Sequence, residues 1–229
     1  MMGKTFVSGG AVMTAPVKGT PLSEVAEGSI VKLNESGSPV EFYIAKHNYE
    51  SDLNGAGRTL LVRKDCYDIR QWHSSNVNAY ASSTIDAWLN GTYKGLLDAT
   101  IQDAIATTKF YYTPGKGNTT LTTLARSIFL LSINELGCWV REGMSGETPN
   151  KEGSELPIAS TLQVAYRNGS AVEQWTRSAC PAGSNRAYQI DSGGYLNYYG
   201  YCADATAGSR PCFTLPATAL VQTDGTIKL

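Results

Sequence analysis

The chain has 229 residues, enough for one large domain with a hydrophobic core or for one domain with a small extension. Hydrophobic residues make up 42% of it, which excludes general disorder, and only 17% are charged, so we expect a loop-rich fold that stays soluble through neutral polar groups. The net charge is −1 and the lysines and arginines are scattered. Because phosphate binding needs a cluster of cations, no nucleic-acid partner is expected.

Hydropathy gives no sign of a membrane segment. No apolar run approaches the roughly 20 residues that a membrane-spanning helix needs, so no membrane insertion is expected. The longest run, residues 128–131, has the length of a buried strand. The first four residues lack the apolar core of a secretory signal. We therefore expect a protein that stays inside its cell, is released by lysis or has lost such a signal.

The N-terminal part of the chain divides into an extension and the start of a domain. Residues 1–24 carry little pattern and predict a tether or an oligomerisation segment, so a homo-oligomer is among the expected states. The domain covers residues 25–229 and opens with a hairpin, because alternating apolar residues flank a run of turn-forming residues. The expected strands are residues 30–33, 40–45 and 58–63, with a turn at 34–38 and a loop at 52–57.

Two helices are expected before the middle of the chain. The first covers residues 82–90, where a Ser or Thr caps the N-terminus and Asn90-Gly91 ends the helix. The second covers residues 96–107. In both, apolar residues recur on one face. These residues are Ile85, Trp88 and Leu89 in the first helix and Leu97, Ile101 and Ile105 in the second.

The second half of the chain predicts more loops and strands than helices. Its composition indicates a strand at residues 127–132, a short helical turn at 134–137, a surface loop at 141–154 and a short helix at 161–167. From residue 174 onward we expect strands and loops with many glycines. The fold class is therefore α+β.

No motif of a catalytic, metal or cofactor site is present. The two histidines, His47 and His73, stand outside any nucleophile motif, and a role as hydrogen-bonded loop residues is favoured for both. The motifs GxSxG and HExxH, the P-loop and the EF-hand loop are absent. The sequence therefore predicts a protein that is not an enzyme, with no catalytic residues, no metal and no cofactor.

The five cysteines argue against a disulfide framework. Their number is odd, their spacing is irregular and no CxxC occurs, so a structural zinc site also has little support. Free thiols are favoured, and one bridge among the last three stays open. The cysteines are Cys66, Cys138, Cys180, Cys202 and Cys212.

The most informative stretch covers residues 183–209. It holds five of the thirteen tyrosines, and Gly, Ser, Asn and Asp supply most of the rest. An antibody-like paratope has this composition, since Tyr gives a large amphipathic contact and Ser, Gly and Asn give adaptable hydrogen bonds. The alternative is a glycine-rich hairpin with core tyrosines, although an extended Tyr198-Tyr199 pair must point to opposite faces. The expected ligand-binding residues are Asn185, Tyr188, Gln189, Asp191, Ser192, Tyr195, Asn197, Tyr198, Tyr199, Tyr201 and Asp204.

Several stretches, taken in order, carry a resemblance to a known family. They are GSIVKLN at residues 28–34, WHSSNVNAY at 72–80, STIDAWLN at 83–90, IFLLS at 128–132, WTRS at 175–178 and GSRPCFTLP at 208–216. Together they resemble a family of domains from gut bacteria and their phages and prophages, often left as domains of unknown function. The resemblance covers about residues 20–220 and is specific in combination, while each piece alone is weak.

This family in turn resembles C-type-lectin-like domains, among them the variable proteins of diversity-generating retroelements. In those proteins a hypervariable C-terminal segment faces the target, and variation at template adenines favours Asn, Tyr, Ser and Asp. The resemblance implies a C-type-lectin-like fold, with two helices on short antiparallel strands and long loops, and it puts residues 185–209 at the variable position. It also implies a phage tail-tip receptor-binding protein or a bacterial surface adhesin, in the virion or on the cell surface, with a host-surface protein or glycan as partner.

Two departures from the wider fold family matter. Calcium-dependent sugar-binding lectins carry Glu-Pro-Asn or Gln-Pro-Asp plus Trp-Asn-Asp, whereas Glu147-Thr-Pro-Asn150 has an insertion and Trp-Asn-Asp is missing, so calcium-mediated sugar binding is not expected. Formylglycine-generating enzymes share the fold and use cysteines near the C-terminus. Cys202 and Cys212 lie in that part of the chain within a different motif, which leaves a distant oxidoreductase as an alternative. A structural virion protein that uses the same face for subunit contacts is the other alternative.

Overall fold

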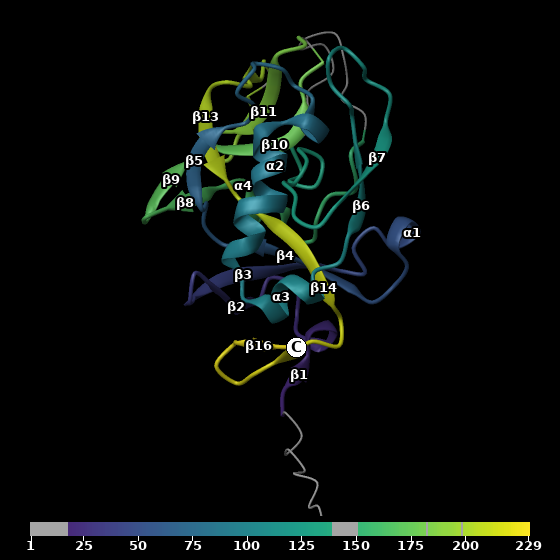
Figure 1. Cartoon of the computed structure of the whole chain (residues 1–229), viewed down its shortest axis with the longest axis vertical. Helices are drawn as coiled ribbons and strands as arrows, with labels where there is room; N and C mark the ends of the chain where they lie inside the picture. The colour runs from purple at the N-terminus through teal and green to yellow at the C-terminus, as the bar shows by residue number, and fades with distance from the viewer. Residues whose placement is uncertain (1–17, 139–150, 182, 198) are drawn as a thin grey trace, which may run out of the picture.

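The computed structural model describes residues 18–138, 151–181, 183–197 and 199–229. It combines antiparallel sheets, short helices and long loops, so the expected α+β class is confirmed (Figure 1). No helix within these residues is both long enough and apolar enough to span a membrane.

A four-stranded antiparallel sheet crosses the middle of the molecule, with strand order β14-β4-β3-β2 (Figure 1). Its strands are β2 (Ile30–Glu35), β3 (Ser38–His47), β4 (Arg58–Arg63) and β14 (Cys212–Pro216). The three strands expected near the N-terminus are confirmed. The turn between the first two is shorter than expected, because only Ser36 and Gly37 separate them. Both have the positive φ that a two-residue type I′ turn requires, 53° and 77°.

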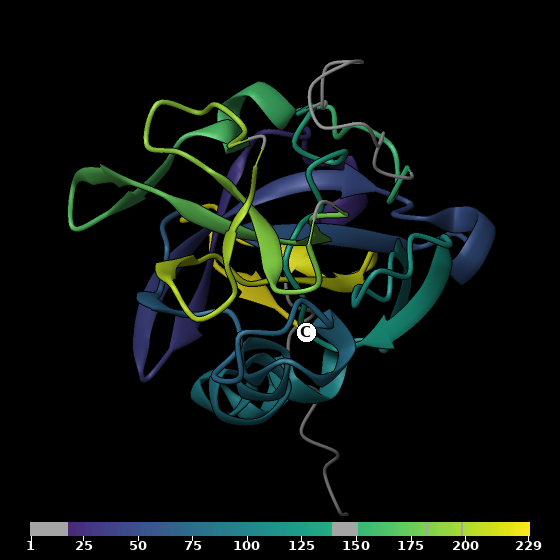
Figure 2. The same cartoon turned by 90° about the horizontal axis from the view of Figure 1, so that it is seen from above.

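A second, five-stranded sheet carries the tyrosine-rich stretch, with strand order β12-β11-β10-β13-β5. Its strands are β5 (Asp68–Gln71), β10 (Gln174–Ala179), β11 (Arg186–Ile190), β12 (Tyr201–Cys202) and β13 (Thr206–Ser209). Strands β10 and β13 run parallel, and the other neighbours are antiparallel. Seen from above, the green strands of this sheet lie in front of the blue and yellow strands of the four-stranded sheet (Figure 2).

The two ends of the described chain meet in a small three-stranded sheet of order β1-β15-β16. Its strands are β1 (Thr20–Pro21), β15 (Leu220–Val221) and β16 (Ile227–Lys228). A 3₁₀ turn, η1 (Leu22–Glu24), follows β1, and the side chain of Leu22 is fully buried. The last residues of the expected N-terminal extension are therefore packed as part of the domain.

Residues 80–96 form a series of short helical turns, called the helical coil here. It consists of the 3₁₀ turn η2 (Tyr80–Ser82), helix α2 (Thr84–Trp88), the π-helical η3 (Leu89–Tyr93) and the 3₁₀ turn η4 (Lys94–Leu96). The expected cap is present, since the Ser83 Oγ accepts a hydrogen bond from the Asp86 backbone N–H at 3.2 Å. The expected end at Asn90-Gly91 is wrong, because the coil continues through both residues with a wider turn.

The expected second helix is shorter than its apolar spacing indicated. Only α3 (Ala99–Ala104) is α-helical, and its C-cap Ile105 is extended. From Thr108 the chain forms the hairpin of β6 (Thr108–Tyr112) and β7 (Thr122–Arg126), which Figure 1 shows along one side of the molecule. A one-turn helix, α1 (Ser51–Asn54), lies in the expected loop after β3 and contacts β6.

The expected helix at residues 161–167 is only half right. Helix α4 (Ala159–Gln163) begins earlier and ends at Gln163. The next residues form β8 (Ala165–Arg167), which pairs with β9 (Ser170–Val172) around the positive-φ pair Asn168 and Gly169. Residues 165–167, which were expected to be helical, therefore form the first strand of a hairpin.

Residues 128–132 are buried as expected and Ser127 is half-buried, but residues 127–132 do not form the expected strand. Phe129 makes a single bridge to Cys212, and the other backbone groups bond mainly to side chains. Asn90 Oδ1 accepts from the Ser127 and Ile128 N–H groups at 3.1 Å, and the Tyr80 hydroxyl accepts from the Leu130 N–H at 3.1 Å. Side chains therefore replace the neighbouring strand that the apolar composition predicted. The short turn at 134–137 is confirmed as hydrogen-bonded turns.

The expected surface loop at 141–154 falls mostly outside the described residues, as does the Glu147-Thr-Pro-Asn150 stretch. Its last part, residues 151–154, has no helix or strand. Glu152 within it is nevertheless only 2% exposed, so this part of the loop reaches into the core.

Candidate functional site

The tyrosine segment, defined here as residues 191–204, leads from β11 through β12 toward β13. Its exposed candidate residues are Ser192, Tyr195, Tyr199, Tyr201 and Asp204. The side chains of Tyr195 and Tyr199 are 74% and 66% exposed, which is unusual for rings of this size. The half-buried candidates are Asn185, Asp191 and Asn197, and Tyr198 lies outside the described residues.

Two expected contact residues, Tyr188 and Gln189, are not on the surface. They are 0% and 1% exposed in the middle of β11. Side chains of successive strand residues point to opposite faces, so one of the two would be exposed if one face of the sheet were open. Strand β11 lies between β10 and β12, and both of its faces are covered. The expectation that these two residues belong to an exposed surface is therefore wrong.

Asp191 shapes the first loop of the tyrosine segment. Its Oδ1 accepts hydrogen bonds from the backbone N–H groups of Gly193 and Tyr195, both at 2.9 Å. Its own N–H donates to the Tyr195 carbonyl at 2.8 Å. This is the local bonding by which Asp side chains build turns. The carboxylate thus holds the exposed Tyr195 in place.

Asn197 builds a second turn in the same way. Its Oδ1 accepts from the Tyr199 N–H at 3.2 Å, and its carbonyl accepts from the Gly200 N–H at 3.1 Å. Gly200 has a φ of 60°, and a Cβ there would lie 2.9 Å from the Cβ of Cys180. Between the two turns, Leu196 is 8% exposed and bridges to Ile190. The exposed rings therefore stand on turns that are anchored to the sheet.

Asn78 supports the start of this region from below. Its Nδ2 lies within 2.8 to 3.1 Å of three backbone carbonyls, and its Oδ1 accepts from the Lys116 N–H at 2.7 Å. The three carbonyls belong to Cys180, Gly183 and Arg186. The Asn78 side chain is 1% exposed, and it ties the connection between β10 and β11 to the loop that contains Lys116. Composition alone gave no reason to single out this residue.

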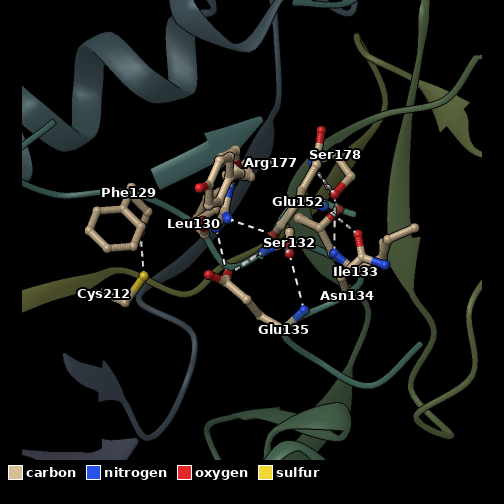
Figure 3. A network of polar contacts seen from close by, with 12 residues as sticks. Phe129, Leu130, Ser132, Ile133, Asn134, Glu135, Glu152, Arg177, Ser178 and Cys212 are labelled. Atoms are coloured by element: carbon tan, nitrogen blue, oxygen red, sulfur yellow. Dashed lines mark hydrogen bonds and ion pairs between the residues drawn. The ribbon is translucent and has the colours of Figure 1, made fainter. Parts of the chain in front are cut away.

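Arg177 occupies the centre of a buried polar network beneath the five-stranded sheet. Its Nη1 donates to Glu135 Oε2 at 2.6 Å, and both side chains are 0% exposed (Figure 3). Its nitrogens also donate to three carbonyls at 3.0 Å, those of Tyr111, Leu130 and Glu152. Although burial lowers the pKa of Arg177, the carboxylate of Glu135 raises it well above its usual range. Arg177 therefore stays charged.

Two buried carboxylates complete the network. Glu135 accepts from the Tyr49 hydroxyl at 2.5 Å and from the Ser132 N–H at 2.8 Å. Glu152 accepts from the Ser178 hydroxyl (Figure 3). It also accepts from the backbone N–H and the hydroxyl of Thr113. Burial raises the pKa of Glu152, and Arg177 opposes that shift. Every charged group here is bonded to protein atoms, which identifies the network as internal support for β10.

The histidines and cysteines have structural surroundings. The two ring nitrogens of His47 lie 3.0 Å from Thr59 Oγ1 and 2.9 Å from the Val25 carbonyl, and His73 Nδ1 accepts from the Ser75 N–H at 3.0 Å. All five cysteines are free thiols, so the open alternative of a bridge among the last three is not realised. Cys202 and Cys212 lie in different sheets. Across the described ranges, no group of three or more His, Cys, Asp or Glu side chains could hold a metal ion.

Comparison with known proteins gives a single positive finding. Neither the curated proteins nor the solved structures contain a match to this chain. A family model described as a domain of unknown function, DUF6273, matches residues 56–217, which is more than half of the chain. This range includes β4, the helical coil, the whole tyrosine segment and every named member of the buried network except Tyr49. The chain therefore belongs to the DUF6273 family.

Proposed function

We propose that this protein is a non-catalytic binding protein that contacts its target through the tyrosine segment. The observation that carries the proposal is the exposure of three tyrosines: Tyr195 and Tyr199 on turns fixed to the sheet, and Tyr201 at the start of β12. Rigid, exposed Tyr rings give large contacts at low entropic cost. If the tyrosines of this segment belonged to the core, they would be buried, as Tyr188 is.

Two buried residues that precede and follow the tyrosine segment in the chain favour the same interpretation. On one side, Trp175 is 2% exposed and its indole N–H donates to the Arg70 carbonyl at 2.9 Å. On the other, Arg210 is 3% exposed and donates to three carbonyls, those of Arg63, Lys64 and Leu162. A frame bonded this way can carry changes in the exposed loops without loss of the fold, because binding residues on loops are positioned by a rigid scaffold.

The proposal extends to a C-type-lectin-like fold and to a receptor-binding role in a phage tail tip or a bacterial surface adhesin. The partner would be a host-surface protein or glycan. The motivation is the order of the family-like stretches together with the Tyr, Asn and Ser content of the segment. Diversification of the segment is tested in the genome that encodes the protein. It requires a reverse transcriptase gene and a near-identical template repeat for about residues 175–215, with differences confined to template adenines.

The binding role is tested with the triple variant Tyr195→Ser, Tyr199→Ser, Tyr201→Ser. Labelled full-length protein is mixed with a panel of gut bacterial strains, and bound protein is measured by flow cytometry. Each stacked or packed ring contributes on the order of 1 kcal/mol or more, so the triple variant should bind at least about a hundredfold more weakly to any strain that wild type binds.

The matched control is Tyr166→Ser. Tyr166 is also an exposed tyrosine, 46% exposed, but it lies in β8 outside the tyrosine segment. The control should bind as wild type does. Equal loss in both variants, or full binding by the triple variant, would overturn the proposal. If the triple variant instead dissociates an oligomer, the segment is a subunit interface of a structural virion protein.

A further inference from the structure

A second candidate site lies away from the tyrosine segment. A polar cleft of about 350 Å³ opens beside α1 and β6, on the opposite side of the molecule from β13 and β5 (Figure 1). Small-molecule sites in proteins start at about this size. The side chains that matter are those of Lys46, Glu50, Asp52, Tyr111, Leu121 and Lys151.

Glu50 is the unusual residue of this cleft. It is 8% exposed, yet among the described residues its carboxylate has no hydrogen bond or ion pair. The backbone there is left-handed, with φ 44° and ψ 54°. Buried carboxylates are almost always paired, because an unpaired buried charge costs several kcal/mol. The Glu50 side chain lines the cleft and its oxygens are not sealed from it, so a cationic group bound there would give this carboxylate a partner.

The wall behind Glu50 is formed by the buried network. A Cβ at Gly153, whose φ is 96°, would lie 3.2 Å from Glu50 Oε1 and 3.2 Å from Glu135 Oε1. The two carboxylates therefore converge on the same glycine. Glu135 is satisfied by Arg177 and Tyr49, whereas Glu50 is not. Burial and then the charge of Glu135 raise the pKa of Glu50.

The rim of the cleft carries charges of both signs. Lys46 is close enough to lower the pKa of Glu50, and Asp52 is close enough to raise it. Asp52 accepts a hydrogen bond from the Tyr111 hydroxyl at 2.8 Å, which fixes its position beside the opening. Lys151 lines the same opening, and Leu121 adds an apolar wall that is 36% exposed. Two lysines and two carboxylate residues thus line the same small cleft.

We propose that this cleft binds a small zwitterion, a free amino acid or a dipeptide, with its ammonium group against Glu50 and Asp52 and its carboxylate toward Lys46 and Lys151. A ligand with only negative charge would leave Glu50 unpaired and add repulsion. A ligand with only positive charge would face both lysines. A zwitterion has one charged group for the two carboxylates and one for the two lysines. An apolar side chain on it would contact Leu121.

The test is isothermal titration calorimetry on the full chain with the twenty common amino acids and glycylglycine. At least one zwitterion should bind, and its N-acetyl and C-amide forms should each bind about tenfold more weakly or worse, because each loses one charged contact. Glu50→Gln should weaken binding by a similar factor, and so should Lys46→Gln. Asp103→Asn is the matched control, since Asp103 is an exposed carboxylate on α3, and it should leave binding unchanged.

Protein stability separates this role from a structural one. Because the Glu50 carboxylate has no partner among the described residues, Glu50→Gln should leave the urea midpoint unchanged or raise it slightly. A fall in that midpoint, the absence of binding by every zwitterion up to about 10 mM, or equal binding of the capped forms would overturn the proposal. None of these outcomes bears on the tyrosine segment, because the variants lie outside residues 191–204.

Discussion

Arg177 shows how much one side chain can fix. All three of its guanidinium nitrogens donate, and their acceptors come from β6, from the buried stretch 127–132, from the turn after it and from the loop that contains Glu152. Its guanidinium also lies 4.6 Å from the ring centre of Phe110. A planar fork with five donors can meet this set of acceptors, and a lysine ammonium cannot.

The substitution Arg177→Lys should therefore lower the free energy of unfolding by about 3–5 kcal/mol, since it leaves buried carboxylate and carbonyl oxygens without donors. Guanidinium denaturation followed by tryptophan fluorescence measures this loss. Arg58→Lys, at a half-buried position at the start of β4, is the control and should cost less than about 1 kcal/mol. A loss below about 1 kcal/mol in Arg177→Lys would show that the network does not stabilise the fold.

At the scale of elements, local patterns predicted several structures that local bonding decides, although they missed the β8–β9 hairpin around Asn168 and Gly169. The hairpin of β2 and β3, strand β4 and the Ser83 cap all follow from alternation, turn residues and capping chemistry. Residues 127–132 were predicted as a strand because apolar composition indicates burial and cannot indicate which groups take the backbone hydrogen bonds. Those groups, the side chains of Asn90, Tyr80 and Glu135, come from distant or following parts of the chain.

The candidate site was likewise predictable only where it depends on local composition. Composition identified the exposed Tyr195, Tyr199 and Tyr201, because a Gly-rich stretch cannot bury every ring. It could not exclude Tyr188 and Gln189, whose burial depends on the elements that cover both faces of β11. Nothing in the sequence was a reason to select Asn78 or Glu50, since their roles depend on which residues lie near them in the folded chain.

The Ser83 cap gives a prediction at this scale. Its hydroxyl accepts from the Asp86 N–H and donates to the Tyr80 carbonyl at 2.8 Å, so it joins η2 to α2. Ser83→Ala should lower the free energy of unfolding by about 1–2 kcal/mol in urea denaturation. Ser160→Ala, an exposed position on α4, should change it by less than about 0.5 kcal/mol. Equal effects of the two changes would mean that the cap does not hold the coil.

At the scale of the whole molecule, the reactivity of the five thiols measures how tightly the core is closed. Cys66, Cys138, Cys180 and Cys212 are buried, and only Cys202 is half-exposed. Burial raises the pKa of Cys66 and of Cys138 to about 11 in each case. A buried thiol with a raised pKa forms little of the reactive thiolate.

With a chromogenic disulfide reagent at about pH 8, the folded protein should therefore release signal from one thiol quickly and from all five only in denaturant. Cys202→Ser should remove the fast phase. Fast reaction of two or more thiols in the folded state would show that the core opens more readily than its packing indicates.

The pairing of β14 with β4 sets the order of events during synthesis. Phe213 lies opposite Leu61, and β13 must reach β5 and β10 before the five-stranded sheet is complete. Contacts so distant in sequence form slowly, and a chain still on the ribosome cannot form them at all. The buried strand β4 and the apolar stretch at 127–132 therefore lack their partner until β14 has been synthesised. A chain cut short before β14 would leave β4 without its neighbour on that side of the sheet.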